Sequence, residues 1–152
     1  MLTKKSKYGL KAVLALAAQE GQQPVLVSDL AEQERIPKKF LEAILLELKR
    51  HGLLQSKKGK GGGYFLGRPA TEITIGQVIR VLDGPLALIP CVSQTAYMKC
   101  EECVDEKTCG VRWAMKEVRD ATARILDNTT LAALDAHVHP PRPRRRAPRK
   151  PA

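Results

Sequence analysis

The chain has 152 residues, a formal net charge of +10, 43% hydrophobic residues and only 4% aromatic ones. This length suits one core with an appendage and excludes two full-sized domains. No apolar run approaches the length of a transmembrane helix, and the lysine-rich start lacks the apolar segment and cleavage site of a signal peptide. We therefore expect a cytoplasmic protein with no membrane partner, where clustered cysteines more often bind metal or respond to redox state than form structural disulfides.

The charge is unevenly distributed. Residues 1–68 hold 13 Lys and Arg against 6 Asp and Glu, residues 69–139 hold 7 against 10, and residues 140–152 hold 6 against none. A basic N-terminal part suits a polyanion, because Lys and Arg displace condensed counterions from phosphate. A charged surface that only faces water is the alternative, which the charge alone does not exclude.

A helix-turn-helix pattern lies near the N-terminus. Helical spacing predicts a first helix over residues 4–19, and Ser28 is expected to cap a short helix that ends at Glu34. Pro37 is expected at the first position of a third helix that reaches about Arg50. The predicted apolar faces are Leu10, Val13, Leu14 and Ala17 in the first helix, and Phe40, Leu41, Ile44, Leu45 and Leu48 in the third. Two helices joined in this way form either a DNA-reading motif or an ordinary helical hairpin.

The next segment, residues 53–67, has the pattern of a β-hairpin. Its sequence LLQSKKGKGGGYFLG predicts strand, turn and strand, and Gly52 is expected to end the preceding helix. Four of the five residues from Gly59 to Gly63 are glycine, so the turn can adopt positive φ angles. Three lysines lie at or beside this turn: Lys57, Lys58 and Lys60. Their charge suits a wing against DNA, whereas a nucleotide-binding loop is disfavoured because no Walker pattern is present.

Three further helices are predicted. Thr74 is expected to cap a short helix that ends at Asp83, and Thr130 to cap a last short one. Between them, a loop over residues 85–108 precedes a helix over residues 111–127. Five residues of this helix alternate steps of four and three, the spacing of a coiled-coil seam: Val111, Met115, Val118, Thr122 and Ile125. A second copy of the chain is the simplest partner for this face, although the face can also pack on its own domain.

All four cysteines lie within nineteen residues: Cys91, Cys100, Cys103 and Cys109. Thiolates suit zinc and iron-sulfur clusters, and four of them can close a tetrahedral zinc site or hold a cluster. Only Cys100 and Cys103 have the spacing of a zinc knuckle. A thiol switch is also open if one cysteine is thiolate-like beside Lys99 or Lys107.

Three stretches together resemble the Rrf2 family of bacterial winged-helix transcription regulators: LTKKSKYGLKAVLALA, IPKKFLEAILLELKRHGLLQSKKGKGGGYFL and TEITIGQVIRVLDG. The similarity covers about residues 1–134. It implies a mostly α fold with a small two-stranded β wing, in which a winged helix-turn-helix domain carries a long dimerisation helix. It also implies a homodimer on a pseudo-palindromic double-stranded DNA operator, with the second helix of the motif in the major groove and the wing in the minor groove.

The chain is accordingly divided into four parts. Residues 1–84 are the expected DNA-binding domain, residues 85–109 a cysteine-bearing sensor loop, and residues 110–136 the dimerisation helix with the closing short helix. Residues 137–152 form a basic tail rich in Pro and Arg, which is expected to be disordered. The tail is either a non-specific DNA-tethering arm or a solubilising end.

The candidate DNA-binding residues come from the first three helices and the wing. They are Lys4, Lys5, Lys7, Ser28, Lys38, Lys39, Phe40, Glu42, Lys57, Lys58, Lys60, Gly61 and Gly62. Glu42 can accept a hydrogen bond from a cytosine amino group. Ala43 lacks the amide with which a glutamine, present here in some family members, pairs with adenine, so a different operator sequence is expected.

The resemblance also bears on the cysteines. Cluster-binding members of the family carry three cysteines in this loop and a fourth ligand that is not cysteine. Cys91, Cys103 and Cys109 match that set with a longer first gap, Cys100 is additional, and Arg112 stands where some members have a histidine ligand. An iron-sulfur cluster, [2Fe-2S] first, is therefore expected, with zinc or no metal as alternatives. The three histidines are expected at the surface: His51, His137 and His139.

The combined prediction is a sequence-specific DNA-binding transcriptional regulator, with repression favoured, whose operator affinity follows a cluster or the redox state of the cysteines. A cluster-free regulator of the same fold, acting through a thiol switch, structural zinc or a partner protein, is the second interpretation. An RNA-binding module ranks third, because stacking aromatics are few. An enzyme is not expected, since no nucleophile and base stand out and no small-molecule substrate is evident.

Overall fold

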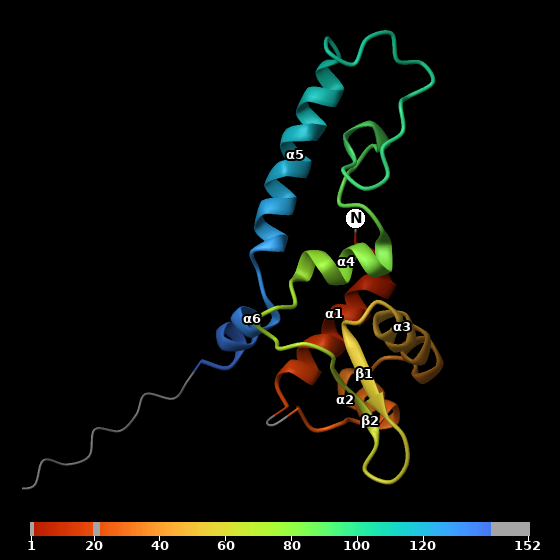
Figure 1. Cartoon of the computed structure of the whole chain (residues 1–152), viewed down its shortest axis with the longest axis vertical. Coiled ribbons are helices and arrows are strands. Elements are labelled where there is room, and N and C mark those ends of the chain that lie inside the picture. Colours follow the sequence, from red (N-terminus) through yellow and green to blue (C-terminus); the bar gives the residue numbers. More distant parts are fainter. Residues whose placement is uncertain (1, 20–21, 141–152) are drawn as a thin grey trace, which may run out of the picture.

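A body of helices and one hairpin carries a long helix that projects away from it (Figure 1). The structure, a computed structural model, describes residues 2–19 and 22–140, so most of the predicted basic tail lies outside the described residues. Its elements are α1 (Lys4–Ala17), α2 (Val27–Glu34), α3 (Lys38–Arg50), β1 (Leu54–Lys57), β2 (Gly63–Leu66), α4 (Ile75–Asp83), the 3₁₀ turn η2 (Pro90–Val92), α5 (Gly110–Asp127) and α6 (Leu131–Val138). The predicted fold class, mostly helical with a two-stranded wing, is confirmed. Over the described ranges, no helix is both long and apolar enough to cross a membrane.

α1 runs through the body and contacts α2, α3, α4, α6 and β2. Thr3 caps it, with its Oγ1 accepting a hydrogen bond from Ser6 N at 3.2 Å. The predicted apolar face packs on the core, with Val13 fully buried and the other three residues half-buried, but the buried Ala12 and Leu16 were not predicted. Gly9 lets α1 pack closely against α4, because a Cβ at this position would lie 2.2 Å from Leu82 Cδ1. The covering of α1 from several sides therefore decides which of its residues are buried.

α2 and α3 form the helix-turn-helix, and both begin slightly away from their predicted places. Leu30 N donates to Leu26 O at 3.0 Å, so Leu26 is the cap of α2. The prediction that Ser28 caps this helix was wrong, and the residue lies exposed in the first turn. Pro37 precedes α3 as its cap instead of being its first residue, since Leu41 N already donates to Pro37 O at 3.0 Å.

β1 and β2 pair antiparallel and form the wing. The predicted positive φ angles are present, at 89° for Gly59 and 75° for Gly61. On the other edge of β2, Tyr64 and Val25 exchange two backbone hydrogen bonds of 2.9 Å. A Cβ at Gly63 would lie 2.3 Å from Val25 O, so glycine permits this close approach. The wing is thereby attached to the segment that leads into α2.

α4 and α6 connect the body to α5. Thr74 caps α4 in a capping box with Gln77, and Thr130 caps α6, both as predicted. Leu131 is fully buried, so α6 closes the core. Within the described part of the chain, α5 has no buried residue. Four of its apolar side chains are exposed: Val111, Trp113, Val118 and Ile125.

Candidate nucleic-acid interface and cysteine pocket

The outer face of α3 presents most of the residues predicted to read DNA. Four of them are exposed while the opposite face lies in the core: Lys38, Lys39, Glu42 and Ala43. Phe40 is also partly exposed, but its ring stands edge-on to Tyr8 with centroids 5.6 Å apart. Phe40 therefore lies partly on this exposed face and partly in the contact between α3 and α1.

Two exposed residues near this face were not predicted. Leu46 is an apolar residue on the outer side of α3. Arg35 is a cation in the turn between α2 and α3, where its φ angle is 55°. Sequence patterns gave no signal for this turn conformation, because residues other than glycine seldom adopt the left-handed region. Both residues add exposed side chains to the helix-turn-helix.

The wing tip exposes its predicted lysines at Lys57, Lys58 and Lys60. Gly61 is exposed beside them, but Gly62 is buried, and a Cβ there would lie 2.3 Å from Lys57 O. Gly62 therefore shapes the turn and does not face solvent. The tip is the end of the hairpin remote from α4 and α5 (Figure 1).

The start of α1 adds further positive charge. Lys4 and Lys7 are exposed. Lys5 differs, because its Nζ lies 2.6 Å from Glu47 Oε2 of α3. Its charge is thus engaged within the chain, which sequence patterns did not reveal.

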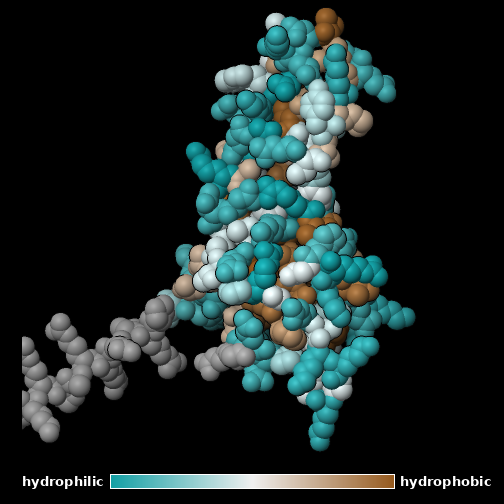
Figure 2. Space-filling model, in the orientation of Figure 1, coloured by the Kyte–Doolittle hydropathy of each residue, from teal (hydrophilic) through white to brown (hydrophobic). Residues whose placement is uncertain are grey.

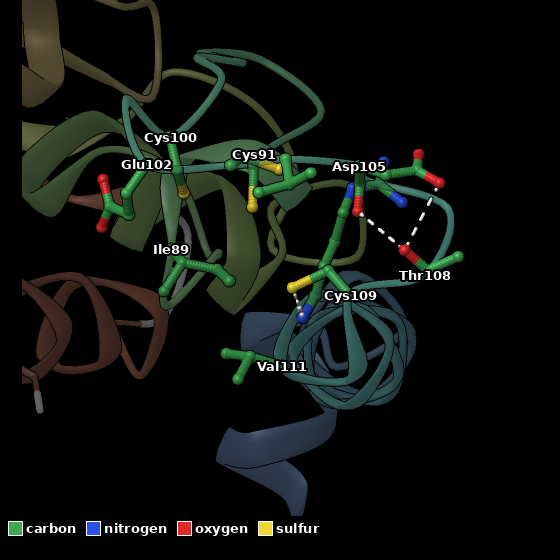
Figure 3. Close-up of a pocket in the computed structure, with 11 residues that line it drawn as sticks. Ile89, Cys91, Cys100, Glu102, Asp105, Thr108, Cys109 and Val111 are labelled. Carbon is green, nitrogen blue, oxygen red and sulfur yellow. Dashed lines mark hydrogen bonds between the residues drawn. The ribbon is translucent and has the colours of Figure 1, made fainter.

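The four cysteines surround one pocket beside the N-terminal end of α5. The pocket has a volume of about 430 Å³. In Figure 3 the sulfur atoms of Cys91, Cys100 and Cys109 point into the same space. Cys91 is buried, the other three cysteines are half-buried, and all four are free thiols. The sequence-predicted cysteine cluster is therefore gathered around a single cavity, although its residues come from a loop, η2 and a helix cap.

Two of these thiols hold their protons more firmly than an ordinary cysteine. A hydrogen bond with Cys91 is the main cause that raises the pKa of Cys100. Loss of water contact raises the pKa of Cys103, while the charge of Lys99 acts in the opposite direction and is outweighed. The charge of Lys99 therefore does not bring the pKa of Cys103 below its ordinary value.

The donor chemistry of the pocket suits a soft metal or an iron-sulfur cluster, because four thiols line it. In the described ranges, however, no three Cys, His, Asp or Glu side chains converge closely enough to hold a metal ion. A bound group would therefore require the loop to close around it. The three histidines are exposed, as predicted.

Arg112 also lines the pocket, and its burial was not predicted. Its backbone N–H donates to Cys109 Sγ at 3.4 Å, which makes Cys109 the cap of α5. Among the described residues, its side-chain Nε is buried without a hydrogen-bond partner. The sequence showed only that arginine replaces a possible ligand here, and gave no sign of an unpaired donor.

The predicted seam on α5 is largely uncovered. Val111, Val118 and Ile125 are 65%, 41% and 60% exposed, and Met115 and Thr122 are half-buried. Figure 2 shows patches of hydrophobic surface along the projecting arm. The alternative that this face packs on its own domain is therefore not supported.

Three sets of side-chain contacts connect the cysteine pocket to the body. The first ties α5 to η2 beside Cys91, the second ties α5 to α4, and the third ties α4 to the start of α1. In the first, Arg119 donates a hydrogen bond to Val92 O. In the second, Arg80 donates two hydrogen bonds of 2.5 and 2.9 Å to the carboxylate of Asp127. In the third, Thr3 N donates to Asp83 Oδ2 at 3.1 Å. These contacts join η2, α5, α4 and the start of α1 in one continuous series.

Known proteins resemble the chain over nearly its whole length. Residues 2–137 match the family described as Rrf2, iron-dependent transcriptional regulator. A putative HTH-type transcriptional regulator, rrf2-like, from Rhodobacter capsulatus is 37% identical over 92% of this chain and 95% of its own. The HTH-type transcriptional regulator IscR of Serratia proteamaculans is 32% identical over 88% of this chain and 77% of its own. The solved structure of CymR, the global cysteine regulator of B. subtilis, has a TM-score of 0.74 at 30% identity, covering 90% of this chain and 97% of that one.

Proposed function

Since the chain belongs to the Rrf2 family of DNA-binding transcriptional regulators and is not an enzyme, we propose that it is a cytoplasmic homodimeric repressor whose operator affinity is set by its cysteine pocket. The observation that carries this proposal is the gathering of four thiols around one cavity at the start of α5. The rest of α5 exposes an apolar face. A change in the pocket therefore acts on the helix that would join two copies of the chain.

DNA reading is assigned to α3 and the wing. The outer face of α3 would lie in the major groove, because its exposed side chains stand opposite the buried face of the helix. The wing would follow the adjacent minor groove with its lysines. Phosphate contacts are assigned to Lys4, Lys7 and Ser28, while Lys5 is given a secondary role because Glu47 already partners it.

Dimerisation is assigned to residues 110–136. The exposed seam residues of α5 have the four-and-three spacing that lets two helices interdigitate. A dimer built on this seam has two copies of α3 related by a two-fold axis. Such symmetry matches a pseudo-palindromic operator, whose half-sites lie about one helical turn apart.

The pocket is proposed to hold an iron-sulfur cluster, with [2Fe-2S] as the first choice. Cys91, Cys103 and Cys109 would be ligands, and Cys100 is the candidate for the fourth position because it lies beside Cys91 at the same cavity. The charge of such a cluster changes with its reduction, and its presence depends on the supply of iron and on oxygen. The sensor loop, residues 85–109, would close around it, and the contacts of Arg119 and Arg80 would pass this closure to α4 and α1.

Protein purified without oxygen tests this proposal. We expect iron and acid-labile sulfide in equal amounts, visible absorbance, and an operator affinity that changes when the cluster is removed. A Cys109→Ser chain should lose both the absorbance and this dependence. Zinc in place of iron would instead indicate a structural site, and protein with neither metal nor absorbance would exclude the cluster.

A cluster-free thiol switch is the second candidate, because Cys91 and Cys100 line the same cavity as free thiols and no described set of donors converges on a metal position. Their oxidation would form one S–S bond, releasing two protons and passing two electrons to a peroxide, which is reduced to water. Mass spectrometry of protein treated with hydrogen peroxide, together with operator binding, separates this candidate from the first. A disulfide that alters operator affinity in metal-free protein would favour it.

A further inference from the structure

Arg112 is a half-buried cation at the edge of the cysteine pocket, and its buried Nε has no hydrogen-bond partner among the described residues. It lies in the first turn of α5, where its side chain lines the cavity with the four thiols. Its Nε is one of only two buried side-chain nitrogen or oxygen atoms without a hydrogen-bond partner among the described residues. Such donors are rare in folded proteins and carry a desolvation cost when unpaired, so each calls for an acceptor.

The surroundings of Arg112 indicate what that acceptor is. Arg112 is the one cationic side chain in the described lining of the pocket, which also contains Glu102 and Asp105. Its own backbone N–H already contacts the sulfur of Cys109. A guanidinium keeps its charge at any physiological pH, and its planar donors suit an anionic acceptor.

Resting on the proposed cluster, we propose that Arg112 is a positioning residue that donates its Nε–H to a sulfur of the bound group and offsets its negative charge. Iron held by thiolates and sulfide is anionic, and a buried anion is stable only when it is paired or hydrogen-bonded. Hydrogen bonds to cluster sulfurs also set the reduction potential. Arg112 thus replaces a metal ligand by a charge, while the cysteines supply the ligation.

Full-length chains carrying Arg112→Gln and Arg112→Lys test the inference, with Arg124→Gln as a control of equal charge change on an exposed site of the same helix. All are reconstituted without oxygen using ferrous iron and sulfide. Iron release to a chelator and the midpoint potential from a redox titration are then measured. We expect Arg112→Gln to retain iron about 10- to 100-fold less well, as when partners of metal ligands are removed.

The potential separates a charge effect from a structural one. One-electron reduction adds a negative charge to the bound group, so removal of a nearby cation should shift the midpoint to a more negative value. Arg112→Lys should restore part of the shift, and Arg124→Gln should behave as wild type. Equal potentials and equal iron release in wild type and Arg112→Gln would overturn the inference, whereas a wild-type chain that binds no iron would overturn the proposed function instead.

Discussion

At the scale of single residues, the proposed DNA reading by α3 includes a position without charge, Ala43. It presents a bare methyl group on the outer face of α3, and Leu46 follows one turn later on the same exposed side. Apolar side chains in the major groove contact the methyl group of thymine, whereas a glutamine would pair with adenine. We therefore expect a thymine opposite Ala43 in each half-site.

Uracil substitution tests this contact by removing only the methyl group. In an operator selected from a random duplex pool, one thymine at a time is replaced by uracil and binding is followed by fluorescence anisotropy. We expect about a fourfold loss at one position of each half-site, because burial of a methyl-sized group contributes about 0.8 kcal/mol. Ala43→Gln should abolish the effect. Equal affinities at every position would refute the contact.

Single-residue roles were predicted from the sequence where they depend on residue type, and missed where they depend on a distant partner. The sequence indicated the four cysteines as one group, and in the fold all four line one cavity. Lys5 looked like any other exposed lysine, but the packing of α1 on α3 brings it to Glu47. The buried Nε of Arg112 likewise results from the fold of the loop over α5. Tertiary neighbours of this kind leave no periodic trace in a sequence.

At the scale of elements, local sequence signals predicted which helices and turns form better than they predicted which face of a helix is buried. The cap at Thr74 and the glycine turn of the wing act over a few residues, and both were predicted correctly. The burial of α1 depends on five neighbouring elements, so its predicted face was narrower than the buried surface, which also includes Ala12 and Leu16. The seam of α5 was predicted from spacing alone. Three of its five residues are exposed in the single chain, so its partner is identified by measuring the oligomeric state.

The seam can be tested by placing charge in it. We expect Val118→Glu combined with Ile125→Glu to convert the dimer into a monomer, because two carboxylates from each chain would be buried without partners. Trp113→Glu, also an exposed apolar residue of α5 but outside the seam spacing, is the matched control and should stay dimeric. Analytical ultracentrifugation gives the mass. A double variant that sediments as a dimer, with unchanged circular dichroism, would contradict the assignment.

The joint between α4 and α5 has a predictable pH dependence. The hydrogen bonds from Arg80 lower the pKa of Asp127 below its ordinary value of 3.8. The pKa of Asp127 is lower in the folded than in the unfolded state. The pair therefore stabilises the fold fully above the ordinary value of 3.8 and loses its effect as the pH falls through the lowered pKa. We expect Asp127→Asn to reduce the free energy of unfolding by less than about 1 kcal/mol at neutral pH, since the pair is partly exposed.

Urea denaturation at neutral pH and below pH 3.8 measures this difference between wild type and Asp127→Asn. The difference should shrink in acid. Glu117→Gln, a neutralised carboxylate at an exposed site of the same helix, should show no comparable trend. A difference that is the same at both pH values would show that Asp127 acts through packing and not through its charge.

At the scale of the whole molecule, the wing and the N-terminal end of α5 lie at opposite ends (Figure 1), and the cysteine pocket lies beside that end of α5. The charge follows this separation, with the basic residues 1–68 forming most of the body and the acidic segment 69–139 containing the cysteine loop. The predicted basic tail, residues 137–152, begins in the last turn of α6, which packs on α1 of the body. The tail therefore starts on the body and not on the projecting arm.

Salt dependence tests whether the tail touches DNA. Residues 140–152 carry six Lys and Arg and no acid. Each phosphate that they neutralise would add about 0.9 to the slope of log affinity against log salt concentration. We expect a chain ending at His139 to bind more weakly at low salt, with a slope shallower by up to about 5 units if all six cations engage phosphate. A full-length chain with the six cations replaced by Gln should match the truncated chain, because only charge is removed. Identical slopes in all three would leave the tail as a solubilising end.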